Sequence, residues 1–181
     1  MSHRAYAAAS DPGRWLAALA VVCFVWAGMV LGISFLEAPV KFQAPSLTLP
    51  VGLDVGRHVF AAFSKVELGW ALLVLLLAVR SRPERAVRVS LAVVLVVVGV
   101  QALWLLPVLD ARVEVFLAGG RPRPSPHHLI YIALEGLKLV GLAFTGIRCL
   151  GAVTRRAGRA RPAAHQHRGA PRWRDRARPR R

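Results

Sequence analysis

Apolar residues along this chain gather in four long blocks that contain few polar side chains. A helix needs about 20 mostly apolar residues to cross the hydrocarbon core of a bilayer, and every block reaches about that length. The blocks cover residues 15–35, 59–79, 87–106 and 129–150. The pattern therefore predicts an all-α fold: an integral membrane bundle of four transmembrane helices, with the lipid bilayer as its surroundings.

Charge is spread unevenly, and most of the basicity lies at the C-terminal end. The net charge is +16, and residues 151–181 hold eleven Arg against one Asp. A segment with so few large apolar residues cannot form a core, so residues 151–181 are predicted to be a disordered, Arg-rich tail. Each basic residue near anionic lipid head groups contributes about 1 kcal/mol of attraction. The tail gives little support for binding nucleic acid, because Trp173 is its only aromatic residue.

The basic segments also predict how the helices are oriented. Arg80, Arg82, Arg85 and Arg88 lie between the second and third blocks, and residues 1–14 hold two more arginines. Because Lys and Arg concentrate in short cytoplasmic loops, both termini are expected in the cytoplasm. The bias toward Arg and Ala is typical of a GC-rich bacterial genome. The expected location is thus a bacterial inner (cytoplasmic) membrane.

Ionisable groups form a stripe on the fourth block, where each costs a few kcal/mol near the bilayer centre. At about 100° per residue, His128, Tyr131, Glu135 and Lys138 lie within a sector of about 80°. In a helix that faces its neighbours with this sector, the polar groups meet protein and not lipid.

A partner for Glu135 follows from depth. Lys65 lies seven residues beyond His58, and Glu135 lies seven beyond His128, which places both about 10 Å below the histidines. Gln101 is about 8 Å from the outer end of its block by the same rise. The sequence therefore predicts a Lys65–Glu135 ion pair in a polar layer that includes Gln101.

Glu67 falls on a different face of the second block from Lys65. That face carries Phe60, Phe63, Trp70 and Val74, whereas Lys65 shares its face with small residues, as expected where helices approach closely. Glu67 is expected either to point to another helix or to be protonated near the interface.

Three hypotheses fit these polar residues. The first is a clasp that holds the helices in register, and the second is a small-solute or metal pathway lined by the same groups. The third is a redox protein with a transition metal or haem bound near the outer mouth, through His58 and His127 or His128, with Glu135 or Glu67 nearby. Tyr131 lies at the same mouth. The third lacks a tight ligand spacing such as HxxxH.

Motifs for enzymatic chemistry are missing: the sequence has no P-loop, GxSxG or HExxH pattern. Gly28-x-x-x-Gly32 is a helix-contact pattern, which would also suit a homo-oligomer. Cys23 and Cys149 stand alone in apolar runs and are expected to be packing residues. The leading hypothesis is accordingly a non-enzymatic membrane protein without a cofactor, and the alternative is an exporter or permease that acts as an oligomer.

Two short elements resemble a known group. Ala38, Pro39 and Phe42 form an Ala-Pro-x-x-Phe element after the first block, and a Gly-x-x-x-Gly-x-x-x-Phe element enters the second block. Its residues are Gly52, Gly56 and Phe60. Together they are similar to small bacterial four-span proteins of the transmembrane protein 205-like group. The resemblance covers about forty residues and implies the same four-span layout, but it supplies no catalytic motif.

Overall fold

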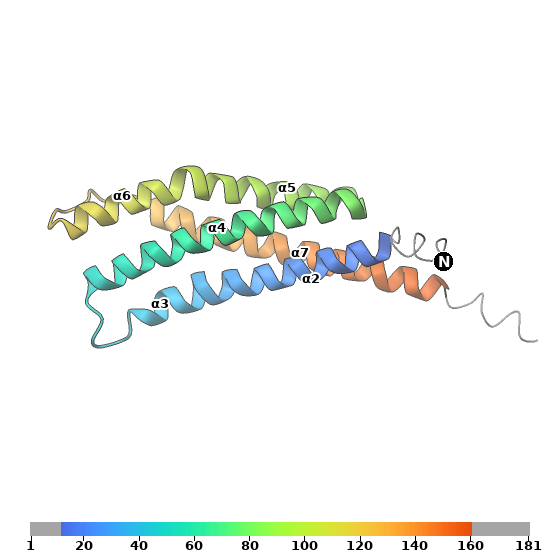
Figure 1. The fold of residues 1–181 in the computed structure, drawn as a ribbon, viewed down its shortest axis with the longest axis horizontal. Helices are drawn as coiled ribbons and strands as arrows, with labels where there is room; N and C mark the ends of the chain where they lie inside the picture. The colour runs from blue at the N-terminus through green and yellow to red at the C-terminus, as the bar shows by residue number, and fades with distance from the viewer. Residues whose placement is uncertain (1–11, 161–181) are drawn as a thin grey trace, which may run out of the picture.

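The computed structural model describes residues 12–160, which form four long helical segments lying side by side (Figure 1). Within those residues, four helices are long and apolar enough to cross a membrane: Pro12–Lys41, Leu49–Ser81, Arg85–Leu117 and His127–Gly158. The predicted all-α membrane bundle is confirmed. At about 1.5 Å per residue each segment is about 45–50 Å long, so its ends extend beyond a hydrocarbon core of about 30 Å.

Two of the four segments change helix type along their length. The first joins α2 (Pro12–Val30), the π-helix η1 (Leu31–Glu37) and α3 (Ala38–Lys41). The second is α4 (Leu49–Ser81). The third joins α5 (Arg85–Val100), the π-helix η2 (Gln101–Leu105) and α6 (Leu106–Leu117), and the fourth is α7 (His127–Ala160).

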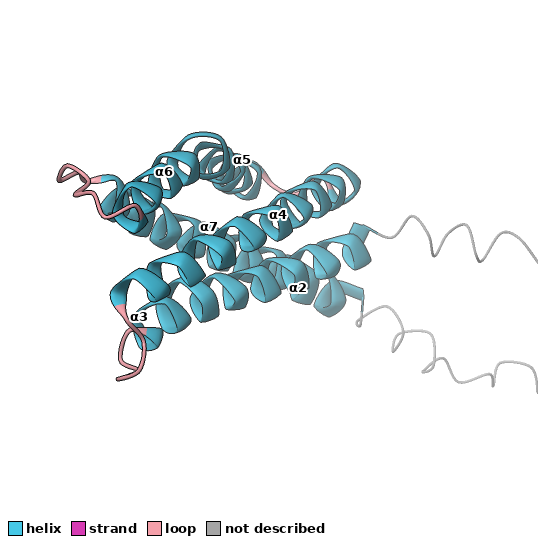
Figure 2. Ribbon diagram, turned by 60° about the vertical axis from the view of Figure 1, so that its left-hand side comes forward, coloured by secondary structure: helices cyan, strands magenta, loops and turns pink. Residues whose placement is uncertain are grey.

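The segments run alternately up and down. The start of α2, the α4–α5 turn and the end of α7 lie at one end of the bundle, here called the basic end (Figure 1). The α3–α4 and α6–α7 loops lie at the opposite end, the loop end. Helix α7 contacts α2 and α5 along much of its length, and α4 contacts α2 more than it contacts α5 (Figure 2).

The turn at the basic end is short because α4 ends abruptly. Arg82 has φ 46°, a left-handed conformation, and its N–H bonds to the carbonyl of Ala78. This conformation closes many helices, although glycine adopts it with less strain. Helix α5 begins three residues later at Arg85.

The interior of the bundle follows one stripe of α7. Six buried side chains along it alternate spacings of four and three, as in the seam of packed helices. They are Tyr131, Glu135, Lys138, Leu142, Thr145 and Cys149. The half toward the basic end is largely apolar and includes Cys23 and Cys149, two buried free thiols that pack as expected.

The predicted tail begins later than expected. Helix α7 continues to Ala160, so residues 151–160 belong to it. The rest of the predicted tail, residues 161–181, and residues 1–11 of the N-terminal segment lie outside the described residues.

Close helix contacts use other glycines than those predicted. A Cβ built on Gly28 or Gly32 would meet nothing within 4 Å, so this pair makes no tight contact inside the bundle. A Cβ on Gly141 would lie 2.7 Å from Val94, and one on Gly146 would lie 2.8 Å from the Phe24 ring. A contact of Gly28 and Gly32 with a second copy of the chain remains a prediction.

Candidate functional site

A lysine buried inside the bundle is the centre of the candidate site. Lys138 Nζ lies 2.5 Å from Glu67 Oε1 and 2.7 Å from Glu135 Oε1, and it donates a hydrogen bond of 2.9 Å to Gln101 Oε1. An ammonium group has three protons and no acceptor. The three oxygens around Lys138 therefore match its full donor capacity.

Further donors surround the two carboxylates. Gln101 Nε2 and Ser34 Oγ each donate to Glu135 at 2.8 Å, one to each carboxylate oxygen, and Trp26 Nε1 donates to Glu67 Oε1 at 3.1 Å. The buried Tyr131, one turn before Glu135 on α7, lies near both carboxylates. We call these residues the charge network: Trp26, Ser34, Glu67, Gln101, Tyr131, Glu135 and Lys138. Each of the four segments contributes at least one.

The two π-helices lie beside the network. Ser34 belongs to η1 and Gln101 is the first residue of η2. π-Helical turns are rare and occur frequently at functional sites. Because a π turn closes its hydrogen bond one residue later than an α turn, it redirects the side chains that follow. Both polar side chains that reach Glu135 from neighbouring segments come from such turns.

The charged and amide groups of the network are fully enclosed. Glu67, Gln101, Glu135 and Lys138 are each no more than 2% exposed. A buried charge is costly unless it is paired and hydrogen-bonded. Among the described residues, the one buried side-chain polar atom without a hydrogen-bond partner is Ser81 Oγ, which lies at the basic end. The network therefore satisfies its buried polar atoms internally.

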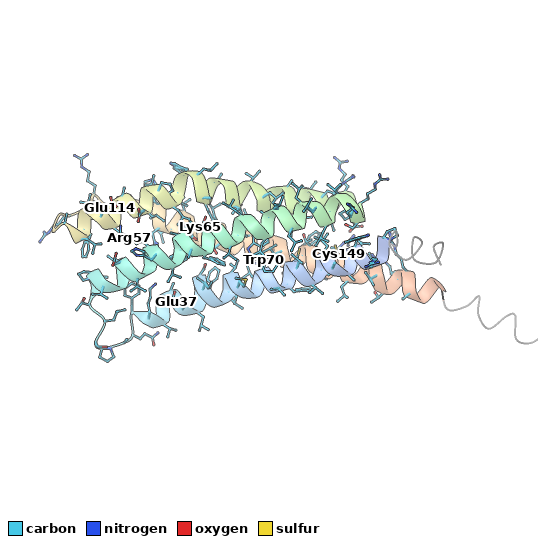
Figure 3. The ribbon with its side chains drawn as sticks, in the orientation of Figure 1. Glu37, Arg57, Lys65, Trp70, Glu114 and Cys149 are labelled. Atoms are coloured by element: carbon cyan, nitrogen blue, oxygen red, sulfur yellow. The ribbon has the colours of Figure 1, made fainter. Side chains whose placement is uncertain are left out.

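The predicted ion pair between Lys65 and Glu135 is wrong. Lys65 is exposed on α4 and makes no ion pair within residues 12–160 (Figure 3). Glu67, two residues further, faces inward with the buried Phe63 and Val74. Gln101 and Glu135 meet at one level, as expected. Helix α4, however, is rotated so that its aromatic face with Glu67, and not its small-residue face with Lys65, meets the bundle.

Two members of the network were not anticipated. Ser34 is the only hydroxyl residue in the block 15–35, and its position near the outer end of that block was a usable signal. Trp26 gave no such signal, because an indole in an apolar block is ordinarily a packing residue. Gln101 and Glu135 of the predicted polar layer meet, and Lys138 of the predicted stripe joins them.

His58, His127 and His128, which lie within the described residues, do not join the charge network. The His58 side chain is 70% exposed, and its Nδ1 lies 2.8 Å from the backbone oxygen of Asp54. His127 Nδ1 lies 2.9 Å from Ser125 Oγ, and His128 is exposed. Within residues 12–160 no group of three or more His, Cys, Asp or Glu is placed to hold a metal ion.

The Ala-Pro-x-x-Phe element (Ala38, Pro39, Phe42) and the Gly-x-x-x-Gly-x-x-x-Phe element (Gly52, Gly56, Phe60) meet at the loop end. A Cβ on Gly52 would collide with the Phe42 ring, and one on Gly56 would lie 3.1 Å from Lys41 Nζ. Lys41 Nζ lies 5.9 Å from the centre of the Phe60 ring. The glycines thus admit the side chains of the preceding segment.

Exposed ion pairs tie α4 to α6 beyond the network. Arg57 lies 2.8 Å from Asp54, 3.6 Å from Asp110 and 3.4 Å from Glu114 (Figure 3). Such exposed pairs stabilise a fold only weakly. They differ in this respect from the enclosed contacts around Lys138.

Comparison of the chain with family models, with curated proteins and with solved structures finds no match.

Proposed function

We propose that this chain is a multi-pass protein of a bacterial inner membrane, with both termini in the cytoplasm, whose charge network is a clasp between its four helices. The proposal rests on the observation that polar side chains from all four segments meet around Lys138, Glu67 and Glu135. In lipid, apolar surfaces give helices no hydrophobic drive to associate, so directional polar contacts and close packing set their register.

Compensating substitutions test the clasp. Lys138→Met leaves two carboxylates without their cation and should strongly destabilise the bundle. Adding Glu67→Gln and Glu135→Gln to Lys138→Met removes both charges while keeping similar shapes. The triple variant should recover most of the lost stability, measured by circular dichroism during unfolding in mixed micelles.

The triple variant also has an outcome that would contradict the clasp. A triple variant no more stable than Lys138→Met would contradict a role in holding the helices together. Glu37→Gln is a matched control, because Glu37 pairs with Lys41 near the loop end and not with the network. Its stability should stay close to that of the unmodified chain.

A second candidate function is proton-coupled movement of a small solute by a homo-oligomer. The observation that favours it is the charge count: two carboxylates surround one ammonium, an excess of one acidic group. Both donors to Glu67 approach Oε1, so a proton on Oε2 would neutralise the network without displacing either contact. Enclosed carboxylates of this kind occur in the proton relays of membrane transporters.

Proteoliposomes test this second candidate. The vesicles contain a pH-sensitive dye, and a potassium diffusion potential that is negative inside is imposed. The unmodified chain should then acidify the lumen faster than empty vesicles do. Glu67→Gln should abolish the difference, whereas Glu37→Gln should retain it. Identical traces for the unmodified chain and Glu67→Gln would rule out this role for Glu67 and leave the clasp untouched.

A further inference from the structure

A groove of about 340 Å³ lies between α4 and α5, and every residue of α4 that lines it lies beyond Glu67 toward the basic end. Apolar side chains line most of its length, among them Leu75 and Val79 of α4 and Ala92 and Leu95 of α5. Arg82 and Arg88 line the same groove. No residue of the charge network does, so the inference below is independent of the proposed function.

The groove runs from the basic end toward the middle of the bundle. Because α4 and α5 are antiparallel and joined by a short turn, Arg82 and Arg88 both lie near that turn. Leu75 and Leu95 each lie seven residues further in, about 10 Å along the helix axis. One leaflet of the hydrocarbon core is about 15 Å thick. The groove therefore extends from the head-group level through most of one leaflet.

The charges at its mouth are not neutralised by the described protein. Glu84, the acidic residue of the turn, lies 2.6 Å from Arg148. Arg80 lies over the Trp15 ring. Arg82 and Arg88 are exposed, and neither has a carboxylate partner within residues 12–160. Two guanidinium groups at head-group level complement a phosphate.

We infer that this groove binds one anionic phospholipid from the leaflet at the basic end. One acyl chain lies along Leu75, Val79, Ala92 and Leu95, and the phosphate is held by Arg82 and Arg88. The shape and the charge support the same occupant: an apolar channel that opens on two cations matches a lipid with one negative head group. Basic pockets between transmembrane helices bind anionic lipids in this way.

The test measures lipid binding to the purified full chain in neutral detergent by native mass spectrometry. The probes are phosphatidylglycerol and phosphatidylcholine with identical acyl chains. The unmodified chain should bind one phosphatidylglycerol at least ten times more tightly than phosphatidylcholine. Arg82→Gln with Arg88→Gln should weaken phosphatidylglycerol binding about 30-fold, at about one decade for every 1.4 kcal/mol.

Matched controls separate the groove from diffuse attraction. Arg85→Gln with Arg155→Gln removes the same charge at the same end of the bundle from residues that do not line the groove, and should change affinity less than threefold. Equal losses in the two double variants would overturn the site. Arg82→Lys with Arg88→Lys keeps the charge and should retain binding; loss of binding with helicity intact would also overturn it.

Filling the groove tests the acyl chain separately. Ala92→Trp should reduce phosphatidylglycerol binding at least tenfold, whereas Val96→Trp, on an exposed part of α5 outside the groove, should not. Unchanged binding by a folded Ala92→Trp variant would show that no acyl chain occupies the groove. A lipid-free dimer that Ala92→Trp disrupts would instead place a second copy of the chain there and overturn the proposal.

Discussion

One stripe of α7 is polar in its half toward the loop end and largely apolar in its half toward the basic end. Tyr131, Glu135 and Lys138 belong to the first half, and Leu142, Thr145 and Cys149 to the second. The same seam therefore meets its neighbours in two ways. Charged groups with many hydrogen bonds fix the first half, whereas close apolar packing and the approach of α5 to Gly141 fix the second.

The difference shows what specifies a bundle in lipid. Lipid tails are as apolar as leucine, so the basic-end half gains from association only what its packing provides. Its few polar contacts are modest: Ser90 Oγ donates to the Gly141 carbonyl at 3.0 Å, and Thr145 Oγ1 donates to Ser90 Oγ at 3.2 Å. In the half toward the loop end, any register in which Lys138 loses its carboxylate partners leaves buried charges unpaired and is destabilised.

The largest expected effect comes from Lys138→Met. The variant leaves the enclosed carboxylates of Glu67 and Glu135 without a cation, which should lower the free energy of unfolding by about 3–5 kcal/mol. Leu142→Met, one turn away on the same stripe, should cost less than about 1.5 kcal/mol. Reversible unfolding in mixed micelles, followed by circular dichroism, measures both. Equal losses would erase the distinction between the two halves.

The next effect tests close packing in the apolar half. Gly141→Ala would bring a Cβ within 2.7 Å of Val94, a fully buried and stiff side chain, and should cost about 1–3 kcal/mol. Gly28→Ala, with nothing within 4 Å, should leave the stability of the monomer unchanged. The same unfolding assay compares them, and a tolerated Gly141→Ala would show that α5 and α7 separate easily.

A smaller effect distinguishes the two glutamates. Glu135 accepts from Gln101 and Ser34 on different oxygens, so in Glu135→Gln the new amide donor must face Ser34, whose hydroxyl has to turn and accept, and Lys138 loses a charged acceptor; the cost should be about 1 kcal/mol. Glu67→Gln keeps the oxygen that faces Trp26 and Lys138 and should cost less. The reverse order, in the same assay, would contradict the assignment of donors to oxygens.

The smallest effect is expected at the loop end. Arg57→Gln removes exposed ion pairs with Asp54, Asp110 and Glu114, which water and salt already screen. Its unfolding midpoint should differ from that of the unmodified chain only at low ionic strength. A large loss at high salt would mean that this end, and not the network alone, sets the register of α4 against α6.

The depth of the network could be predicted from the sequence more reliably than the rotation of α4. Rise per residue is nearly constant, so Gln101 and Glu135 fall at one level as expected. Rotation depends on which face is apolar, and in a membrane both the lipid-facing and the bundle-facing sides are apolar. The sequence therefore predicts that the small-residue face with Lys65 meets the bundle, whereas in the structure the aromatic face with Glu67 does so.

The π-helices explain why Ser34 was harder to place. A wheel drawn at about 100° per residue assumes α-helical geometry throughout, and η1 departs from it over Leu31–Glu37. Side chains in and beyond η1 point in directions that the wheel does not give. The role of the Trp26 indole N–H could not be predicted for another reason. It depends on the Glu67 carboxylate, which only the fold brings near it.

The two buried thiols make the bundle its own reporter. Cys23 of α2 and Cys149 of α7 are the only cysteines of the chain and are both almost fully enclosed in the apolar half. A maleimide can alkylate them only when the helices that cover them separate, so labelling kinetics follow local opening. The rate at which the native protein is alkylated therefore measures how often the helices of the half toward the basic end separate, and no engineered label is needed.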